Sequence, residues 1–227
     1  GHGQGSSQQH HHAGMSSRGF FIVLEGPEAS GKSTLLQPLA ALMRDSKVDP
    51  VVVREPGGTR AAEIARQALL DPEHPVGPLA ELFLYLAARA DLVETVILPA
   101  LERGRVVLSD RFALSTEAYQ MAGRSLDPML VRAGNQAATH GLIPDLTIIL
   151  DLPPELGQAR QIAAGKRQDR LDRESMDFHR RVVDYYLAIR GEKVRHLDAR
   201  LSPDRLLQAA WAEVRAAAPE MFPVTVG

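Results

Sequence analysis

The stretch Gly26-Pro-Glu-Ala-Ser-Gly31-Lys32-Ser33-Thr34 matches the phosphate-binding pattern Gly-x4-Gly-Lys-Ser/Thr, between an apolar run that ends at Leu24 and a helix-like run that begins at Leu35. Glycines let the backbone close around an anion, and the N–H groups of the loop and of the following helix then point at phosphate oxygens. In such a loop Lys32 reaches the β- and γ-phosphates, and the Ser33 hydroxyl ligates Mg²⁺. The sequence therefore predicts a strand–loop–helix unit whose nucleotide site is formed by Gly26, Glu28, Ser30, Gly31, Lys32, Ser33 and Thr34.

The rest of the chain alternates short apolar segments with helical patterns. Continuous apolar runs, such as Val51–Val53 and Ile148–Leu150, are typical of parallel strands that are covered on both faces. The alternation predicts right-handed βαβ units in an α/β, doubly wound sheet of five parallel strands, with its ligand site beyond their carboxyl ends. We predict strands at Phe20–Glu25, Pro50–Arg54, Arg105–Asp110, Leu146–Asp151 and Lys193–Leu197. We predict helices at Lys32–Arg44, Arg60–Leu70, Pro78–Glu102, Leu114–Ala122, Asp127–Thr139, Pro154–Ala163, Ser175–Arg190 and Pro203–Ala217.

Length and composition predict a single globular domain. The chain has 227 residues, of which 24% are charged and 44% are hydrophobic. Its net charge of −2 gives no general attraction to nucleic acid or to an anionic membrane, and no apolar run approaches the ~20 residues that span a bilayer. We therefore expect neither partner. Cysteine is absent, which excludes disulfides, thiol nucleophiles and Cys-ligated metals and fits a reducing, cytoplasmic compartment.

The first 14 residues are polar and rich in Gly, Ser, Gln and His, without the apolar core of a signal peptide. We interpret His10-His11-His12 as the remnant of an expression tag rather than as a metal site. Met15 is taken as the native start, and residues 15–227 are expected to form one domain. Within it, the polar and partly basic stretch Gly165–Arg173 separates two predicted helices and is expected to be a mobile lid.

Arginines near the predicted strand ends are candidates for binding a second anion, because guanidinium forks match phosphate oxygens. The carboxyl ends of parallel strands meet at one edge of the sheet, so polar residues there should converge with Lys32. The candidate arginines are Arg54, Arg66, Arg89 and Arg111.

Several motifs occur in a fixed order along the chain: Glu25-Gly26-x-Glu28-x-x-Gly31-Lys32-Ser33-Thr34, Arg54-Glu55-Pro56-Gly57-Gly58-Thr59, Ala87-Ala88-Arg89, Asp110-Arg111-Phe112 and Pro144-Asp145-Leu146-Thr147. The set, from about Phe20 to about Tyr186, resembles bacterial thymidylate kinase. The phosphate loop alone is generic, whereas the Arg54–Thr59 motif is highly specific. The resemblance implies a nucleoside-monophosphate-kinase fold with a lid, and transfer of the γ-phosphoryl group of ATP to dTMP with Mg²⁺. It also implies a homodimer, for which the apolar helix Leu79–Leu101 could supply the interface.

The resemblance assigns residues to the dTMP nucleoside. Arg89 is expected to hydrogen-bond the thymine edge, and Tyr85, one helical turn earlier, to stack on the base. Thr116 and Gln120 are placed for the base edge. Tyr119 resembles the tyrosine that crowds the sugar 2′ position.

The resemblance also assigns residues to the phosphates and the metal. Arg66 and Arg111 are expected to hold the dTMP phosphate, and Asp110 to help place Mg²⁺ or that phosphate. Glu55 is expected to brace the loop or to order water near the metal. In the family, an acidic residue at Glu28 contacts the sugar 3′-hydroxyl region and nearby basic groups. Whether Arg54 contacts ligand or only the loop backbone stays open.

The lid is expected to supply a catalytic cation. One subclass of the family carries a catalytic arginine directly after the acidic loop residue, but here that position is Ala29. The chain therefore resembles the subclass whose arginine comes from the lid. Arg167 and Arg170 are the leading candidates among the four lid cations Lys166, Arg167, Arg170 and Arg173.

Three other functions fit a phosphate loop. A regulatory GTPase usually carries Asn-Lys-x-Asp, but the only asparagine of this chain, Asn135, is followed by Gln136. A deoxynucleoside kinase phosphorylates a hydroxyl and needs a general base, for which Glu25 or Glu55 would be available. A non-catalytic nucleotide-binding protein is the third alternative, and the intact loop lysine argues against it.

Overall fold

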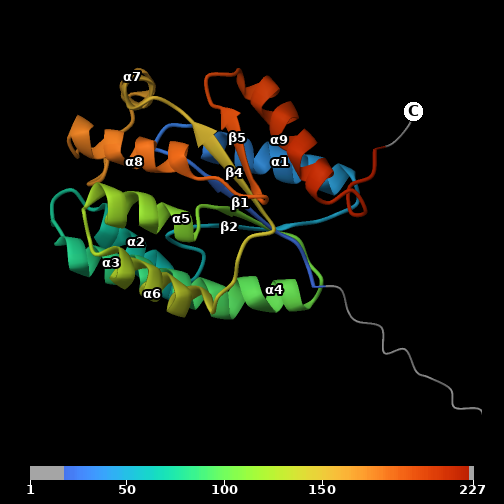
Figure 1. Cartoon of the computed structure of the whole chain (residues 1–227), viewed down its shortest axis with the longest axis horizontal. Coiled ribbons are helices and arrows are strands. Elements are labelled where there is room, and N and C mark those ends of the chain that lie inside the picture. The colour runs from blue at the N-terminus through green and yellow to red at the C-terminus, as the bar shows by residue number, and fades with distance from the viewer. Residues whose placement is uncertain (1–17, 225–227) are drawn as a thin grey trace, which may run out of the picture.

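The computed structural model describes residues 18–224, so the expectations for the tag, for His10–His12 and for Met15 lie outside the described residues. Its centre is one parallel sheet with the strand order β2-β3-β1-β4-β5 (Figure 1). The predicted five-stranded parallel α/β sheet is confirmed. The strands are β1 (Phe21–Glu25), β2 (Val51–Arg54), β3 (Val107–Asp110), β4 (Leu146–Asp151) and β5 (Val194–Asp198).

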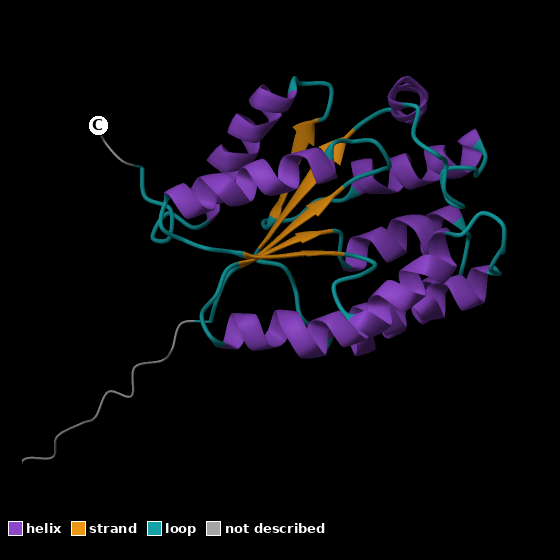
Figure 2. Cartoon of the chain, turned by 180° about the vertical axis from the view of Figure 1, so that it is seen from behind, coloured by secondary structure: helices purple, strands orange, loops and turns teal. Residues whose placement is uncertain are grey.

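Helices cover both faces of the sheet, as seen from behind in Figure 2. Helices α1 and α9 pack on one face; α3, η1 and α4, together with η2 and α8, pack on the other. The helices are α1 (Lys32–Asp45), α2 (Arg60–Leu70), α3 (Pro78–Leu92), η1 (Val93–Ile97), α4 (Leu98–Glu102), α5 (Ala113–Thr116), η2 (Glu117–Gly123), α6 (Pro128–Thr139), α7 (Pro154–Ala164), α8 (Met176–Ala188) and α9 (Pro203–Ala217).

Strand β1 shows why the apolar runs are continuous. Ile22 and Leu24 point into the core under α1 and α9, whereas Phe21 and Val23 point into the opposite core. All four side chains are at most 1% exposed. Because successive side chains of a strand alternate between faces, a strand covered on both sides has no polar face.

Two long predicted helices contain wide turns that the sequence pattern does not reveal. The segment predicted as one helix over Pro78–Glu102 includes the π-helical η1, and the one predicted over Leu114–Ala122 is the short α5 followed by the π-helical η2. A single wide turn lies within an otherwise helical apolar pattern, so a search for helical periodicity assigns the whole segment as one helix. Such turns rotate the side chains that follow, and η2 carries two of the predicted substrate residues, Tyr119 and Gln120.

The sheet brings the predicted site residues to one edge. The register pairs Asp110 at the end of β3 with Leu24 of β1 on one side and with Arg54 of β2 on the other. The loops after these three strands therefore start side by side. Over residues 18–224, the helices are all too short or too polar to cross a membrane.

Candidate functional site

The phosphate loop joins the end of β1 to the start of α1. Gly26 has φ 142°, and a Cβ there would lie 2.7 Å from the Leu150 carbonyl oxygen, so only glycine fits. Gly31 caps α1 in the left-handed conformation with φ 98° and offers no capping side chain. The amides of the first helical turn therefore remain available to an anion.

Lys32 lies under this loop rather than in solvent. Its Nζ donates to the carbonyl oxygens of Gly26 and Pro27, each at 2.9 Å, and to Ser30 Oγ at 3.3 Å. The side chain is 6% exposed. Burial, together with the nearby Arg111, lowers the pKa of Lys32 to about 8, although Asp110 and Glu28 partly oppose this shift. A bound polyphosphate would place negative charge beside the Lys32 ammonium and would favour its charged form.

Arg111 contacts both the phosphate loop and the side chains beside it. Its guanidinium donates to the Gly26 carbonyl oxygen at 3.0 Å and to Glu28 Oε1 at 2.7 Å, and it lies 5.1 Å from the centre of the Tyr119 ring. Arg111 has φ 75°, a strained conformation for a non-glycine residue of the kind that clusters at functional sites. Burial acts to raise the pKa of Glu28, but Arg111 and Lys32 outweigh it, so that pKa lies below its ordinary value.

Arg89 is the centre of a buried polar network, with 2% exposure. Its Nε donates to both carboxylate oxygens of Glu55, at 3.1 and 3.0 Å. The other contacts are Thr116 Oγ1 and Asn135 Oδ1, both at 2.7 Å, and the Phe112 carbonyl oxygen at 3.0 Å. Burial raises the pKa of Glu55 to about 7 despite the lowering effect of Arg89. Four of the five N–H groups of Arg89 are therefore engaged by the protein.

Sequence reasoning missed Asn135 as a member of this network. Its Nδ2 donates to the Ala113 carbonyl oxygen at 3.1 Å while its Oδ1 accepts from Arg89. The available signal was the only asparagine of the chain, placed within a helix of small and apolar residues.

Most of the predicted dTMP residues line one small cavity of about 30 Å³ beside Arg111. It brings together segments from the loop, α3, η2 and the predicted lid, which supplies Leu171. The cavity therefore combines a cationic end at Arg111 with an aromatic and amide end. Its lining residues are Glu28, Tyr85, Arg111, Ser115, Thr116, Tyr119, Gln120 and Leu171.

Three predicted substrate residues lie outside this lining. Arg89 and Glu55 form a second layer: Arg89 donates to Thr116, which lines the cavity, and also to Glu55. Arg66, on α2, donates to the Pro56 carbonyl oxygen at 2.9 Å. Burial and the neighbouring Arg54 lower the pKa of Arg66.

Asp110 and Ser33 are suited to a hard cation. Asp110 Oδ1 is buried without a hydrogen-bond partner, which is an unusual state for a carboxylate oxygen. Ser33 is exposed at the start of α1. A carboxylate, a hydroxyl and phosphate oxygens are the ligands that Mg²⁺ prefers.

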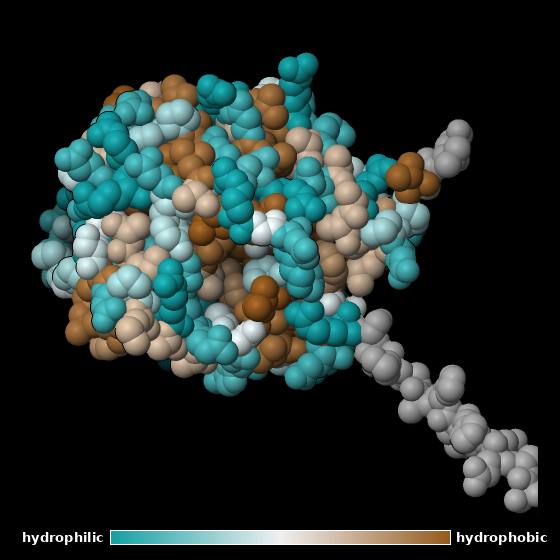
Figure 3. Space-filling model, in the orientation of Figure 1, coloured by the Kyte–Doolittle hydropathy of each residue, from teal (hydrophilic) through white to brown (hydrophobic). Residues whose placement is uncertain are grey.

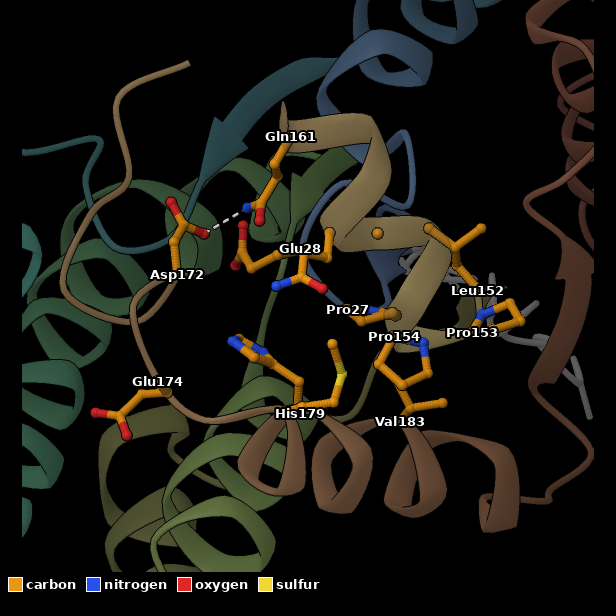
Figure 4. Close-up of a pocket in the computed structure, with 13 residues that line it drawn as sticks. Pro27, Glu28, Leu152, Pro153, Pro154, Gln161, Asp172, Glu174, His179 and Val183 are labelled. Carbon is orange, nitrogen blue, oxygen red and sulfur yellow. Dashed lines mark hydrogen bonds between the residues drawn. The ribbon is translucent and has the colours of Figure 1, made fainter. Parts of the chain in front are cut away.

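A cavity beneath the predicted lid lies next to Glu28 (Figure 4). Gln161 of α7 donates to Asp172 Oδ1 at 2.6 Å, and this bond closes one side of the cavity. Figure 4 shows Glu28 between Gln161 and His179 of α8. Glu28 thus shares this cavity with Asp172 and Glu174 of the segment that joins α7 to α8, and its side chain remains 30% exposed.

The two leading lid arginines are not at the phosphate loop in this conformation. Arg167 is 78% exposed and lies 3.9 Å from Glu73. Arg170 is 9% exposed, forms an ion pair with Glu81, and donates from Nε to the Leu69 carbonyl oxygen at 2.8 Å. The catalytic roles assigned to these two arginines stay predictions.

Arg160 of α7 is a cation at the loop that sequence reasoning missed. It donates to the carbonyl oxygens of Ala29 at 3.1 Å and Ala199 at 2.6 Å. It precedes the uncharged stretch Gln161–Gly165, whereas the four predicted lid cations follow that stretch. Arg160 borders a pocket of about 410 Å³ that is lined also by Ala29, Ser30, Gly31, Thr34, Leu35, Pro38, Ala199, Leu201, Pro203, Asp204, Leu206 and Leu207.

Exposed apolar side chains lie on α2, α3 and α6, which pack side by side. The residues suggested as an interface are partly core residues, because Leu82, Val93 and Ile97 are fully buried within the chain. Apolar side chains are visible at the lower left of Figure 3, over this part of the molecule. The exposed residues are Ile64 (60%), Leu79 (48%), Phe83 (52%), Met129 (80%) and Leu130 (39%).

Comparison with known proteins gives consistent matches. The family model described as thymidylate kinase matches residues 24–210. The thymidylate kinase of Carboxydothermus hydrogenoformans is 44% identical over 190 residues, covering 83% of this chain and 93% of the relative. That of Nitratidesulfovibrio vulgaris strain DP4 is 47% identical over 207 residues, covering 87% and 92%. That of Deinococcus radiodurans is 45% identical over 201 residues, covering 87% and 97%.

Proposed function

Because this chain belongs to the thymidylate kinase family, we propose that it transfers the γ-phosphoryl group of ATP to dTMP, giving dTDP. The observation that carries the proposal is the position of Arg111. Its guanidinium donates to the phosphate-loop carbonyl of Gly26 and also lines the cavity that contains Tyr85 and Gln120. A phosphate held there would lie between the nucleotide loop and a pocket suited to a base.

The donor would bind on the other side of the loop. The loop amides and Lys32 would hold the β- and γ-phosphates, as in other phosphate-loop enzymes. The pocket bordered by Arg160 and Leu206 begins at Gly31 and has the apolar walls and planar cation that suit a purine. Ser33 and Asp110 would hold Mg²⁺, which neutralises phosphate charge when bound.

The acceptor would be held by arginines and aromatic side chains. Arg111 and Arg66 would bind the dTMP phosphate, Tyr85 would stack on the base, and Thr116 and Gln120 would meet its edge. Arg89 would read the base with its remaining N–H group or orient Thr116 for this task. Glu28 and Tyr119 would border the sugar.

Positioning and charge would supply the catalysis. The acceptor is already an ionised phosphate, so no strong general base is needed. Lys32, the loop amides and a lid cation would neutralise the charge that spreads over the transferring group. To reach the loop, Arg167 would have to leave only the exposed Glu73, whereas Arg170 would have to leave the buried Glu81.

The structure gives an argument against a deoxynucleoside kinase, which needs a free carboxylate base. Glu25 is fully buried and accepts hydrogen bonds from Phe112 N, Ser115 Oγ and Tyr186 Oη. Glu55 is paired with Arg89. For Glu25 or Glu55 to act as a general base, the buried hydrogen bonds that hold its carboxylate would therefore have to break.

The assay that tests the function couples ADP release to ATP and Mg²⁺ with dTMP, dUMP, dCMP, dGMP, AMP or thymidine as acceptor. We expect strong turnover with dTMP, weaker turnover with dUMP and little with thymidine. Turnover with thymidine but not with dTMP would assign the chain to the nucleoside kinases. Nucleotide binding without any turnover would favour the non-catalytic alternative.

The affinity for ATP should depend on pH through Lys32. Its pKa in the free protein is about 8, and phosphate binding favours the charged form, so binding takes up a proton above that pH. We expect kcat/KM for ATP to be level up to about pH 8 and to fall about tenfold per pH unit above it. Lys32→Arg should remove this decline, because a guanidinium stays protonated. A decline that persists in Lys32→Arg would assign the pKa to another group.

We also propose that the protein is a homodimer through the apolar face of α2, α3 and α6, and that it acts in the cytoplasm, where ATP is available. Phe83→Glu would bury a charge in such an interface and should weaken dimerisation at least about 100-fold. Sedimentation velocity measures this change. Leu187→Glu, on α8, is the matched control because Leu187 is 43% exposed outside this face. Equal mass for both variants and the unchanged protein would contradict the assignment.

A further inference from the structure

Glu81, in the first turn of α3, has a carboxylate without solvent exposure that accepts hydrogen bonds from three side chains of two other segments, η2 with its C-terminal cap and the lid. Gln120 Nε2 donates to Oε1 at 2.8 Å. Arg124 donates to Oε1 and Oε2, both at 3.1 Å, and Arg170 donates to Oε2. Arg124 also donates to Glu174 at 2.5 Å, so the two arginines are balanced by two carboxylates.

Two of these donors belong to functional segments. Gln120 lines the candidate dTMP cavity from η2. Arg170 belongs to the lid, and its Nε and backbone N–H donate to the carbonyl oxygens of Leu69 and Leu70 at the end of α2. The next lid residue, Leu171, is 5% exposed and lines the same cavity as Gln120. The Glu81 carboxylate thus contacts Gln120, which lines the cavity, and Arg170, which precedes the lid residue that covers it.

We propose that Glu81 is a positioning residue that orients Gln120 toward the dTMP base and keeps the lid docked through Arg170. The base-reading half of this inference rests on the proposed function, whereas the lid half does not. Glu81 lies outside the cavity lining and acts only through its neighbours. Arg170 is accordingly an anchor of the lid in the docked state.

Glu81 must be a carboxylate because only a carboxylate can accept all of these hydrogen bonds. It serves four N–H groups of three side chains from its two oxygens. An amide of the same shape has one acceptor oxygen and would turn an NH₂ group toward a guanidinium. The amide can take two orientations, each of which loses one of these two sides, so Glu81→Gln should weaken the hold on both Gln120 and Arg170 while changing the packing little.

The first test measures amide hydrogen exchange of the full, ligand-free chain. In Glu81→Gln, peptides that cover residues 165–175 should exchange about tenfold faster than in the unchanged protein, because the docked lid loses its anchor. Glu155→Gln is the matched control, since Glu155 pairs at 2.9 Å with Arg180 on an exposed surface of α7 and α8. It should leave lid exchange unchanged.

The second test separates positioning from general damage. Glu81→Gln should raise KM for dTMP about tenfold and leave KM for ATP within about twofold. The double variant Glu81→Gln/Arg170→Gln should have the kcat of Arg170→Gln alone, because both changes remove one interaction. A purely structural role would instead lower the active fraction without a change in KM.

Each outcome of these tests either supports or overturns the proposed role of Glu81. Unchanged lid exchange in Glu81→Gln, an equal rise in both KM values, or additive losses in kcat would overturn the proposal. If Glu81→Gln does not fold, Arg170→Gln must still speed lid exchange and Gln120→Ala must still raise KM for dTMP alone, and failure of either overturns it. If the unchanged protein does not phosphorylate dTMP, the proposed function is wrong, and lid exchange still decides the anchoring role.

Discussion

Lys32→Ala should lower kcat about 10²- to 10³-fold while leaving the protein at least as stable as before. The Nζ atom is the buried cation of the phosphate loop, and loss of one such preorganised group typically costs about 10² to 10³ in kcat. Stability should not fall, because burial disfavours the charged lysine, as its lowered pKa of about 8 shows. The ADP-release assay and a thermal unfolding curve measure the two effects.

The matched control is Lys193→Ala, which removes an exposed lysine next to β5. It should leave both activity and stability unchanged. Near-normal turnover in Lys32→Ala would refute the phosphoryl-transfer scheme. Loss of activity together with a large loss of stability would mean that Lys32 acts by holding the loop.

Arg89→Met should destabilise the fold by about 3–5 kcal/mol at pH 8, because it leaves the buried carboxylate of Glu55 without its partner. The loss should be smaller at pH 6. Burial already raises the pKa of Glu55 to about 7, above its unfolded value of 4.5, so the folded state binds the extra proton below pH 7. The Glu55 contribution to stability is therefore present at low pH and is lost as the pH rises through about 7. In Arg89→Met the buried Glu55 carboxylate has no cationic partner, so the stability lost as the pH rises is larger.

Urea unfolding of Arg89→Met at pH 6 and pH 8 measures this difference. Arg44→Met is the control, since Arg44 forms an exposed pair with Asp49 and should change stability by less than about 1 kcal/mol at either pH. The double variant Arg89→Met/Glu55→Gln should recover part of the loss at pH 8. An equal loss at both pH values would mean that the ionisation of Glu55 does not control this site.

The sequence alone determined those features for which a residue pattern fits only one kind of local structure. The loop glycines with Lys32 predict a phosphate site, and the continuous apolar strands predict a parallel sheet covered on both faces. The ordered motifs identified the family, which the comparisons confirm. The family resemblance also pointed to six of the eight residues that line the small cavity.

Only the tertiary structure decided which charges meet. The sequence predicts Arg170 as a catalytic lid cation, and only the structure shows that its partner in this conformation is Glu81, 89 residues away. Arg89 engages Asn135 of α6, and Arg160 engages Ala29 of the loop. Local sequence sets helix, strand and loop through short-range sterics and hydrophobic period. The partner of a long charged side chain depends on how the elements pack, because its head can reach several neighbours and burial selects the one that satisfies its hydrogen bonds.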